Sequence, residues 1–212
     1  MERIYRLDKI VLRITKADKL LGNVTSNTLD AEKNALLDRF GKIVVTFNQI
    51  KHNDFFSIVI GKKFYERFMT AIKMYLKLTK AKVVKTNCKV YFDLDKKYKA
   101  KLSIPQNKGQ LIITNEELDS NITEEEFTLF RLKNNIPIQG IDYDNEMLLN
   151  VSEEFVSYGK GCFLGQEVIA RVHYKSKPPK KLAVVENLEN MTSRVKDPKT
   201  GKELGFAFIE TK

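Results

Sequence analysis

The chain has 212 residues, of which 42% are hydrophobic and 30% charged, proportions that are ordinary for a globular protein. Its apolar runs are far too short to cross a bilayer, so a membrane-spanning protein is not expected. The net charge of +10 comes from lysine-rich segments that attract polyanions or only solvate the surface. Because aromatic residues do not interleave with these lysines, direct nucleic-acid binding is not expected.

Strand signals dominate the first half of the chain. Apolar residues alternate or cluster as in strands at 10–14, 36–37, 43–47, 55–60, 83–84, 90–94 and 110–113. Residues 16–21 indicate a short helix or turn. The apolar stripe over residues 62–79 predicts a longer amphipathic helix, to which we assign packing and no chemistry.

The second half begins with a clear helix signal. Thr123 and Glu126 form a capping box, which predicts a helix that continues through Leu132. Residues 175–181 are rich in lysine and proline and predict a stiff hinge. Two strands are expected beyond it, at 182–185 and 203–209. Together these elements predict an α+β fold, with antiparallel sheet and helices on one face.

The most informative stretch is residues 160–167, which read Lys-Gly-Cys-Phe-Leu-Gly-Gln-Glu. A helix signal follows Gly165, so Cys162 is expected in the turn that enters a helix. Reactive thiols are partly exposed and lie near positive charge or a helix N-terminus, and Lys160 supplies such a charge. The alternative is a buried structural cysteine.

Metal chemistry has little support in the sequence. Cys88 is the second cysteine, and with no recognisable export signal both thiols are expected to be reduced, in the cytoplasm. His52 and His173 are the two histidines, too few for a histidine-rich metal site. A single thiol cannot hold an iron–sulfur cluster, so no stably bound metal is expected.

Residues 160–167 resemble the signature of the folate-binding YgfZ family, relatives of the glycine-cleavage T-protein that act in iron–sulfur cluster assembly. Three other segments match that family in the same order: residues 20–27 are similar to its Leu-Gln-Gly-Gln-Val-Thr-Asn-Asp segment, and residues 35–43 to its next block. Arg131, residues 136–137 and residues 140–142 resemble the block before the signature.

This resemblance implies an architecture. Such chains form intertwined antiparallel-sheet subdomains closed by a C-terminal β-barrel, with folate near a central hole. Residues 1–177 would be the folate-binding region, made of two α+β subdomains. Residues 178–212 look too short for a whole barrel and would be a reduced remnant of it.

The resemblance also implies a function. The protein would bind tetrahydrofolate or a related folate and act as an accessory protein in the assembly or repair of [4Fe–4S] clusters. Its partners would be assembly proteins or client enzymes, including tRNA-modifying enzymes. Cys162 would be a transient cluster ligand or a redox-active thiol, with Lys160 lowering its pKa.

A folate-dependent one-carbon transferase is the alternative, and whether the protein is an enzyme stays open. T-protein-like sequences carry a Gly-Gly-Ile-x-Asp-Asp block whose aspartate orients the folate amine. The corresponding residues 41–46 contain no acid, so ordinary aminomethyl transfer is not expected. Asp38 or Glu167 would then be the orienting carboxylate.

The expected folate contacts come from chemistry and resemblance together, since a pterin edge needs donors and acceptors and a glutamate tail needs cations. The candidates are Thr25, Asn27, Asp38, Arg131, Tyr158, Gly161, Gln166, Glu167 and Arg171. Capping is an equally good interpretation of Thr25 and Asn27, and internal ion pairs are the alternative for the two arginines. The thiol and the pterin are expected to share one cavity.

Overall fold

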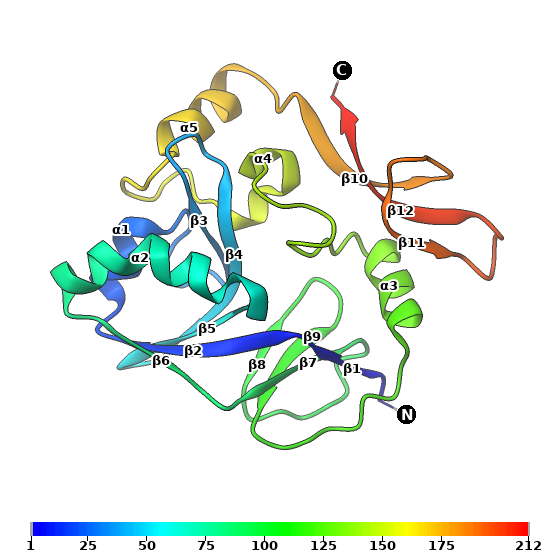
Figure 1. Ribbon diagram of the computed structural model, residues 1–212, viewed down its shortest axis with the longest axis horizontal. Coiled ribbons are helices and arrows are strands. Elements are labelled where there is room, and N and C mark those ends of the chain that lie inside the picture. The colour runs from blue at the N-terminus through cyan, green and yellow to red at the C-terminus, as the bar shows by residue number, and fades with distance from the viewer. Residues whose placement is uncertain (1, 212) are drawn as a thin grey trace.

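A computed structural model describes residues 2–211, and it contains three antiparallel sheets. Figure 1 shows them grouped around the middle of the molecule, with the five-stranded sheet on the left, the four-stranded sheet below and the three-stranded sheet on the right. Among residues 2–211, no helix is both long and apolar enough to cross a membrane.

The five-stranded sheet has the order β3-β4-β5-β2-β6. Its strands are β2 (Lys9–Thr15), β3 (Lys33–Leu37), β4 (Ile43–Lys51), β5 (Phe55–Gly61) and β6 (Lys82–Lys85). The helices α1 (Asp18–Val24) and α2 (Tyr65–Thr79), with the 3-10 turn η1 (Lys62–Phe64), lie over it (Figure 1). Phe68 and Ile72 of α2 are fully buried, as the apolar stripe predicts.

The four-stranded sheet has the order β1-β7-β9-β8. Its strands are β1 (Ile4–Leu7), β7 (Lys89–Asp93), β8 (Ser103–Pro105) and β9 (Gln110–Thr114). Helix α3 (Glu124–Lys133) begins at Thr123 with the predicted capping box, and its Phe127 stacks on Tyr5 at 4.3 Å between ring centroids. Consecutive strands β1 and β2 belong to different sheets, so the chain passes between the two early in the sequence.

The three-stranded sheet, order β10-β12-β11, forms the C-terminal part. Its strands are β10 (Lys180–Glu186), β11 (Thr192–Lys196) and β12 (Glu203–Glu210), and β11 was not expected from the sequence. The connection before it carries α4 (Leu148–Val151), η2 (Glu153–Phe155) and α5 (Gln166–Lys175). The predicted hinge at 175–181 is shorter than expected, because α5 and β10 extend into it from both sides.

The core is divided among the sheets. One apolar cluster fills the space between α1, α2 and the five-stranded sheet, and a second joins that sheet to the four-stranded sheet and α3. A third cluster brings α4, α5 and the C-terminal sheet together, and it contains Phe163 at 8% exposure. These separate cores leave the region between the sheets available for a cavity.

Candidate functional site

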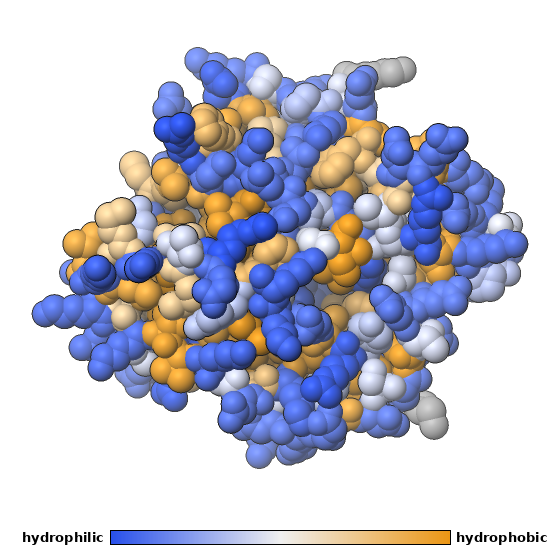
Figure 2. Space-filling view, in the orientation of Figure 1, coloured by the Kyte–Doolittle hydropathy of each residue, from blue (hydrophilic) through white to orange (hydrophobic). Residues whose placement is uncertain are grey.

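A cavity of about 700 Å³ lies where the three sheets meet. Its wall is formed by β1, β2, β4 and β5, by β7, β9 and α3, and by the segment that leads to β10. Figure 2 shows the molecule hollowed near the middle of the visible face. This volume is within the range of about 300–1,000 Å³ that is typical of small-molecule sites.

The polar wall of this cavity carries more lysine than acid. Four lysines and two glutamates line it, together with several side-chain amides: Lys9, Lys33, Lys177, Lys181, Glu153, Glu154, Asn48, Gln106, Asn107 and Gln139. Glu154 is already occupied, because its carboxylate accepts from Lys33 Nζ and from Asn107 Nδ2, each at 2.7 Å. The remaining charge makes the cavity favourable for an anionic ligand.

A neutral hydrogen-bonded cluster occupies the wall at β4. Thr46 donates from its backbone nitrogen to Gln139 Oε1 at 2.7 Å, and its hydroxyl lies 2.9 Å from the Tyr143 hydroxyl. Burial raises the pKa of Tyr143, which keeps the phenol protonated. Thr46 ends the 41–46 block that lacks the acid of T-protein-like sequences, so the cavity has no carboxylate at this point.

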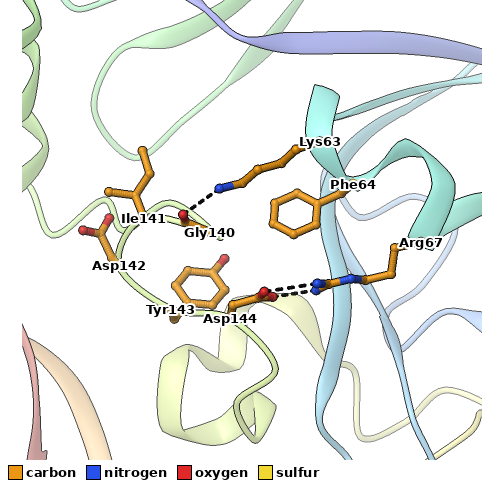
Figure 3. A pocket seen from close by; sticks show the side chains of 8 residues that line it. All are labelled: Lys63, Phe64, Arg67, Gly140, Ile141, Asp142, Tyr143 and Asp144. Carbon is orange, nitrogen blue, oxygen red and sulfur yellow. Dashed lines mark hydrogen bonds and ion pairs between the residues drawn. The ribbon is translucent and has the colours of Figure 1, made fainter.

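The loop that supplies Gln139 and Tyr143 is held from both sides. Arg131 forms a buried ion pair with Asp142 at 2.7 Å and donates to Ser193 Oγ of β11 at 2.7 Å. On the other side, Lys63 Nζ donates to the Gly140 carbonyl at 2.6 Å, and Arg67 pairs with Asp144 at 2.7 Å (Figure 3). Arg131 is therefore engaged inside the protein rather than directed at a ligand.

The shallow groove beside this loop is less suited to a ligand. It has a volume of about 370 Å³ and is lined by the residues in Figure 3. Their charged groups already have partners: Arg67 pairs with Asp144, and Lys63 donates to the Gly140 carbonyl. We regard it as the outer side of the clamp that fixes the cavity wall.

Cys162 lies in a loop of residues 158–165, which we call the thiol loop. The cysteine is free and exposed, and α5 begins directly after Gly165, as predicted. Lys160 Nζ donates to the Gly22 carbonyl at 2.6 Å, near the C-terminal end of α1, where a helix leaves carbonyls without partners. Burial lowers the pKa of Lys160, and the nearby Cys162 opposes that shift.

The two glycines of the thiol loop signature serve different purposes. Gly165 has φ +83°, and a Cβ there would lie 2.4 Å from the Asp38 carbonyl oxygen. Its missing side chain therefore allows the loop to pack against the turn that begins at Asp38. No atom lies within 4 Å of a Cβ added at Gly161, so the space next to Cys162 is open.

Three of the other predicted residues make local structural contacts. The Thr25 hydroxyl donates to the Leu21 carbonyl at 2.7 Å, and Asn27 Nδ2 donates to the carbonyls of Lys33 and Glu154. The carboxylate of Asp38 accepts from two backbone nitrogens of its own turn. For Thr25 and Asn27, local contacts of this kind were the alternative that the sequence left open, whereas the turn contacts of Asp38 were not expected.

The remaining predicted residues lie in the thiol loop or on α5, which follows it. Tyr158 stacks on His173 with 3.6 Å between ring centroids, and burial raises the pKa of its phenol to about 12. Gln166 Nε2 donates to the Lys160 carbonyl at 3.4 Å, whereas Glu167 and Arg171 are exposed on α5.

The structure therefore gathers the thiol, Lys160, Gly161 and Gln166 in one place but separates them from the cavity. Within residues 2–211, none of the residues predicted from the sequence lines the 700 Å³ cavity. The shared hollow for thiol and pterin that the sequence suggested is not found there. Lys9, Lys33, Asn107 and Gln139 were missed because they lie on two strands and two loops that are far apart in the sequence and share no local motif.

No family model matches the sequence. The structure resembles the crystal structure of the glycine cleavage system aminomethyltransferase T from Bartonella henselae, with a TM-score of 0.71 and 9% sequence identity. The match covers 99% of this chain and 78% of that one. At this identity the similarity shows the fold alone: the chain has a T-protein-like α+β fold.

Proposed function

We propose that this protein binds tetrahydrofolate or a related folate in the central cavity. The observation that carries the proposal is a lysine-rich cavity of suitable volume at the junction of the sheets in a T-protein-like fold. Side-chain amides such as Gln139 and Asn48 can pair with the donor and acceptor edge of a pterin, and the lysines with the carboxylates of a glutamate tail.

Binding is tested by titrating the protein with tetrahydrofolate by calorimetry and by thermal melting. A ligand that binds the folded state stabilises it by about 2.7 kcal/mol at a concentration one hundred times its Kd, which raises the melting temperature. The same titration with adenine, an uncharged heterocycle without carboxylates, serves as a specificity control. If millimolar tetrahydrofolate produces no binding heat and no shift in melting temperature, folate is excluded as the ligand.

With folate bound, the protein would act as an accessory protein in the assembly or repair of [4Fe–4S] clusters. Its clients would be enzymes that contain such clusters, including tRNA-modifying enzymes. The resemblance of residues 160–167 to the YgfZ signature supports this role, and so does the exposure of the Cys162 thiol. Because Cys162 lies outside the cavity, a partner protein can reach the thiol while folate is bound.

The role in cluster assembly is tested by complementation of a strain that depends on [4Fe–4S] enzymes. Cys162→Ala is expected to fold normally and to lose support of those enzymes. Cys88→Ala is the matched control, because this second thiol is half-buried and its Sγ lies 3.1 Å from Asn115 Oδ1. Full support by the Cys162→Ala protein would remove the thiol from the mechanism.

A folate-dependent one-carbon transferase is the second candidate, and the similarity to an aminomethyltransferase favours it. Its orienting carboxylate would be Asp38 or Glu167, although Asp38 is engaged in its turn and Glu167 is exposed on α5. The test is turnover of a methylamine-type donor with tetrahydrofolate, and its loss in Asp38→Asn or Glu167→Gln. Absence of turnover in the wild-type protein would reject this candidate.

A further inference from the structure

One lysine of the cavity differs from the others. Lys9 is the first residue of β2 and lines the cavity. Alternate residues of a strand face the same side, so Lys9 shares a face with Val11. Val11 is buried in the same apolar cluster as Phe92 and Phe127, and those two aromatic residues also line the cavity. The Lys9 ammonium therefore stands in an apolar and aromatic wall.

This ammonium has no counter-charge within residues 2–211, because no hydrogen bond or ion pair joins its Nζ to another described residue. Lys33, which lines the same cavity, is paired with Glu154 at 2.7 Å, whereas Lys177 and Lys181, the other two lysines of the wall, are exposed to solvent. Desolvation lowers the pKa of Lys9 to about 8, so the Lys9 amine is still protonated in most molecules at neutral pH. A cation in an apolar wall is unfavourable unless it is paired.

The cross-strand neighbour of Lys9 is a glycine. Gly61 lies directly opposite Lys9 in the antiparallel pair of β2 and β5, and it also lines the cavity. Its φ of −59° suits any residue, so backbone conformation does not require glycine here. A Cβ at this position would lie 3.0 Å from the Phe64 ring. The absence of a side chain therefore lets the Phe64 ring pack against β5 next to Lys9, and this ring is another aromatic part of the cavity wall around the ammonium.

We infer that Lys9 is the anion-binding centre of the cavity and that it binds a carboxylate of the ligand. This inference rests on the proposed function, because it requires the cavity to be the ligand site. It places the glutamate end of a folate next to Lys9, at the start of β2. The carboxylate would supply the counter-charge that the protein itself does not provide, in a charge-assisted hydrogen bond.

The test compares two halves of the ligand in calorimetric titrations. p-Aminobenzoylglutamate carries the carboxylates, and 6-methyltetrahydropterin carries the ring without them. Lys9→Met is expected to weaken binding of the first fragment by roughly 10- to 100-fold, as for loss of a hydrogen bond to a charged group, and to leave the second unchanged. Lys62→Met is the matched control, because Lys62 is exposed and close in sequence to Gly61 but does not line the cavity.

Folding is monitored in the same variants. Removal of an unpaired cation from an apolar wall is expected to keep or raise the melting temperature of the ligand-free Lys9→Met protein. Weaker binding together with retained stability would assign Lys9 to the ligand. Equal binding of p-aminobenzoylglutamate by Lys9→Met and the wild-type protein, or an equal loss for both fragments, would overturn the inference.

The two proposals fail in different ways. If tetrahydrofolate does not bind but a simple aryl carboxylate binds and depends on Lys9, folate is the wrong ligand and the anion site stands. If tetrahydrofolate binds equally to Lys9→Met and the wild-type protein, folate stands and the anion site is wrong. If the wild-type protein binds neither tetrahydrofolate nor any carboxylate probe, both are wrong.

Discussion

The thiol loop and the central cavity are encoded in the sequence in opposite ways. The thiol loop is one continuous run, residues 158–165, and its cysteine, lysine and glycines can be read directly from the chain. The cavity is assembled from all three sheets, and its lining residues extend from Leu7 to Thr211. A motif search therefore finds the thiol loop and not the cavity, although the cavity has the volume and charge of a ligand site.

The thiol loop and the cavity also differ in whether their half-buried lysine has a hydrogen-bond partner. Lys160 is half-buried but has a partner, the Gly22 carbonyl at 2.6 Å. Lys9 faces a cavity and has no partner within the part of the chain that the structure describes. The first arrangement stabilises the protein by itself, and the second leaves an interaction for a ligand to complete.

The largest effect is expected where the cavity wall is anchored. Arg131→Met would leave the Asp142 carboxylate buried without its partner, which costs about 3–5 kcal/mol of unfolding free energy. Urea denaturation measures this loss, and alkylation of Cys162 should proceed at the wild-type rate because the thiol loop is not involved. Recovery of most of the stability in Arg131→Met/Asp142→Leu would assign the cost to the unpaired charge, whereas a loss below about 1 kcal/mol would contradict the buried pair.

A smaller effect is expected where the thiol loop packs on the Asp38 turn. Gly165→Ala introduces a side chain at φ +83° and a Cβ 2.4 Å from a backbone oxygen, so we expect a loss of about 2–4 kcal/mol. Gly161→Ala is the control and should change stability by no more than about 0.5 kcal/mol, because its added Cβ meets open space. Similar losses for both variants would show that the two glycines do not differ as described.

The last effect on stability appears only when the pH is changed. The pKa of Lys9 is about 8 in the folded protein and has an ordinary value of 10.5, so the unfolded chain binds more protons between these two values. The stability of the wild-type protein relative to Lys9→Met should therefore rise as the pH increases from about 8 to 10.5. Unfolding curves of the two proteins across this window measure the difference, and a constant difference would show that Lys9 is not desolvated.

Local signals account for what the sequence predicted correctly. The capping box at Thr123, the apolar stripe of α2 and the start of α5 after Gly165 each depend on residues within a few positions of one another. The strands β1, β8 and β11 were missed. Of these, β11 has a register shift between Thr192 and Val195 and a positive φ at Ser193, which interrupt the alternation that marks a strand.

Long-range partners account for what could not be predicted. The sequence left Arg131 between a folate contact and an internal ion pair, and the answer depends on Asp142 and on Ser193, which is 62 positions away. In the same way, the cavity wall around Lys9 depends on Phe92 and Phe127 from another sheet and its helix. Only the topology brings these side chains together.

The most direct test is a calorimetric titration of tetrahydrofolate into the wild-type, Cys162→Ala and Lys9→Met proteins at neutral pH. If the cavity and not the thiol loop binds the ligand, Cys162→Ala will bind with wild-type affinity and Lys9→Met will bind roughly 10- to 100-fold more weakly. Loss of binding in Cys162→Ala with retained binding in Lys9→Met would contradict this account.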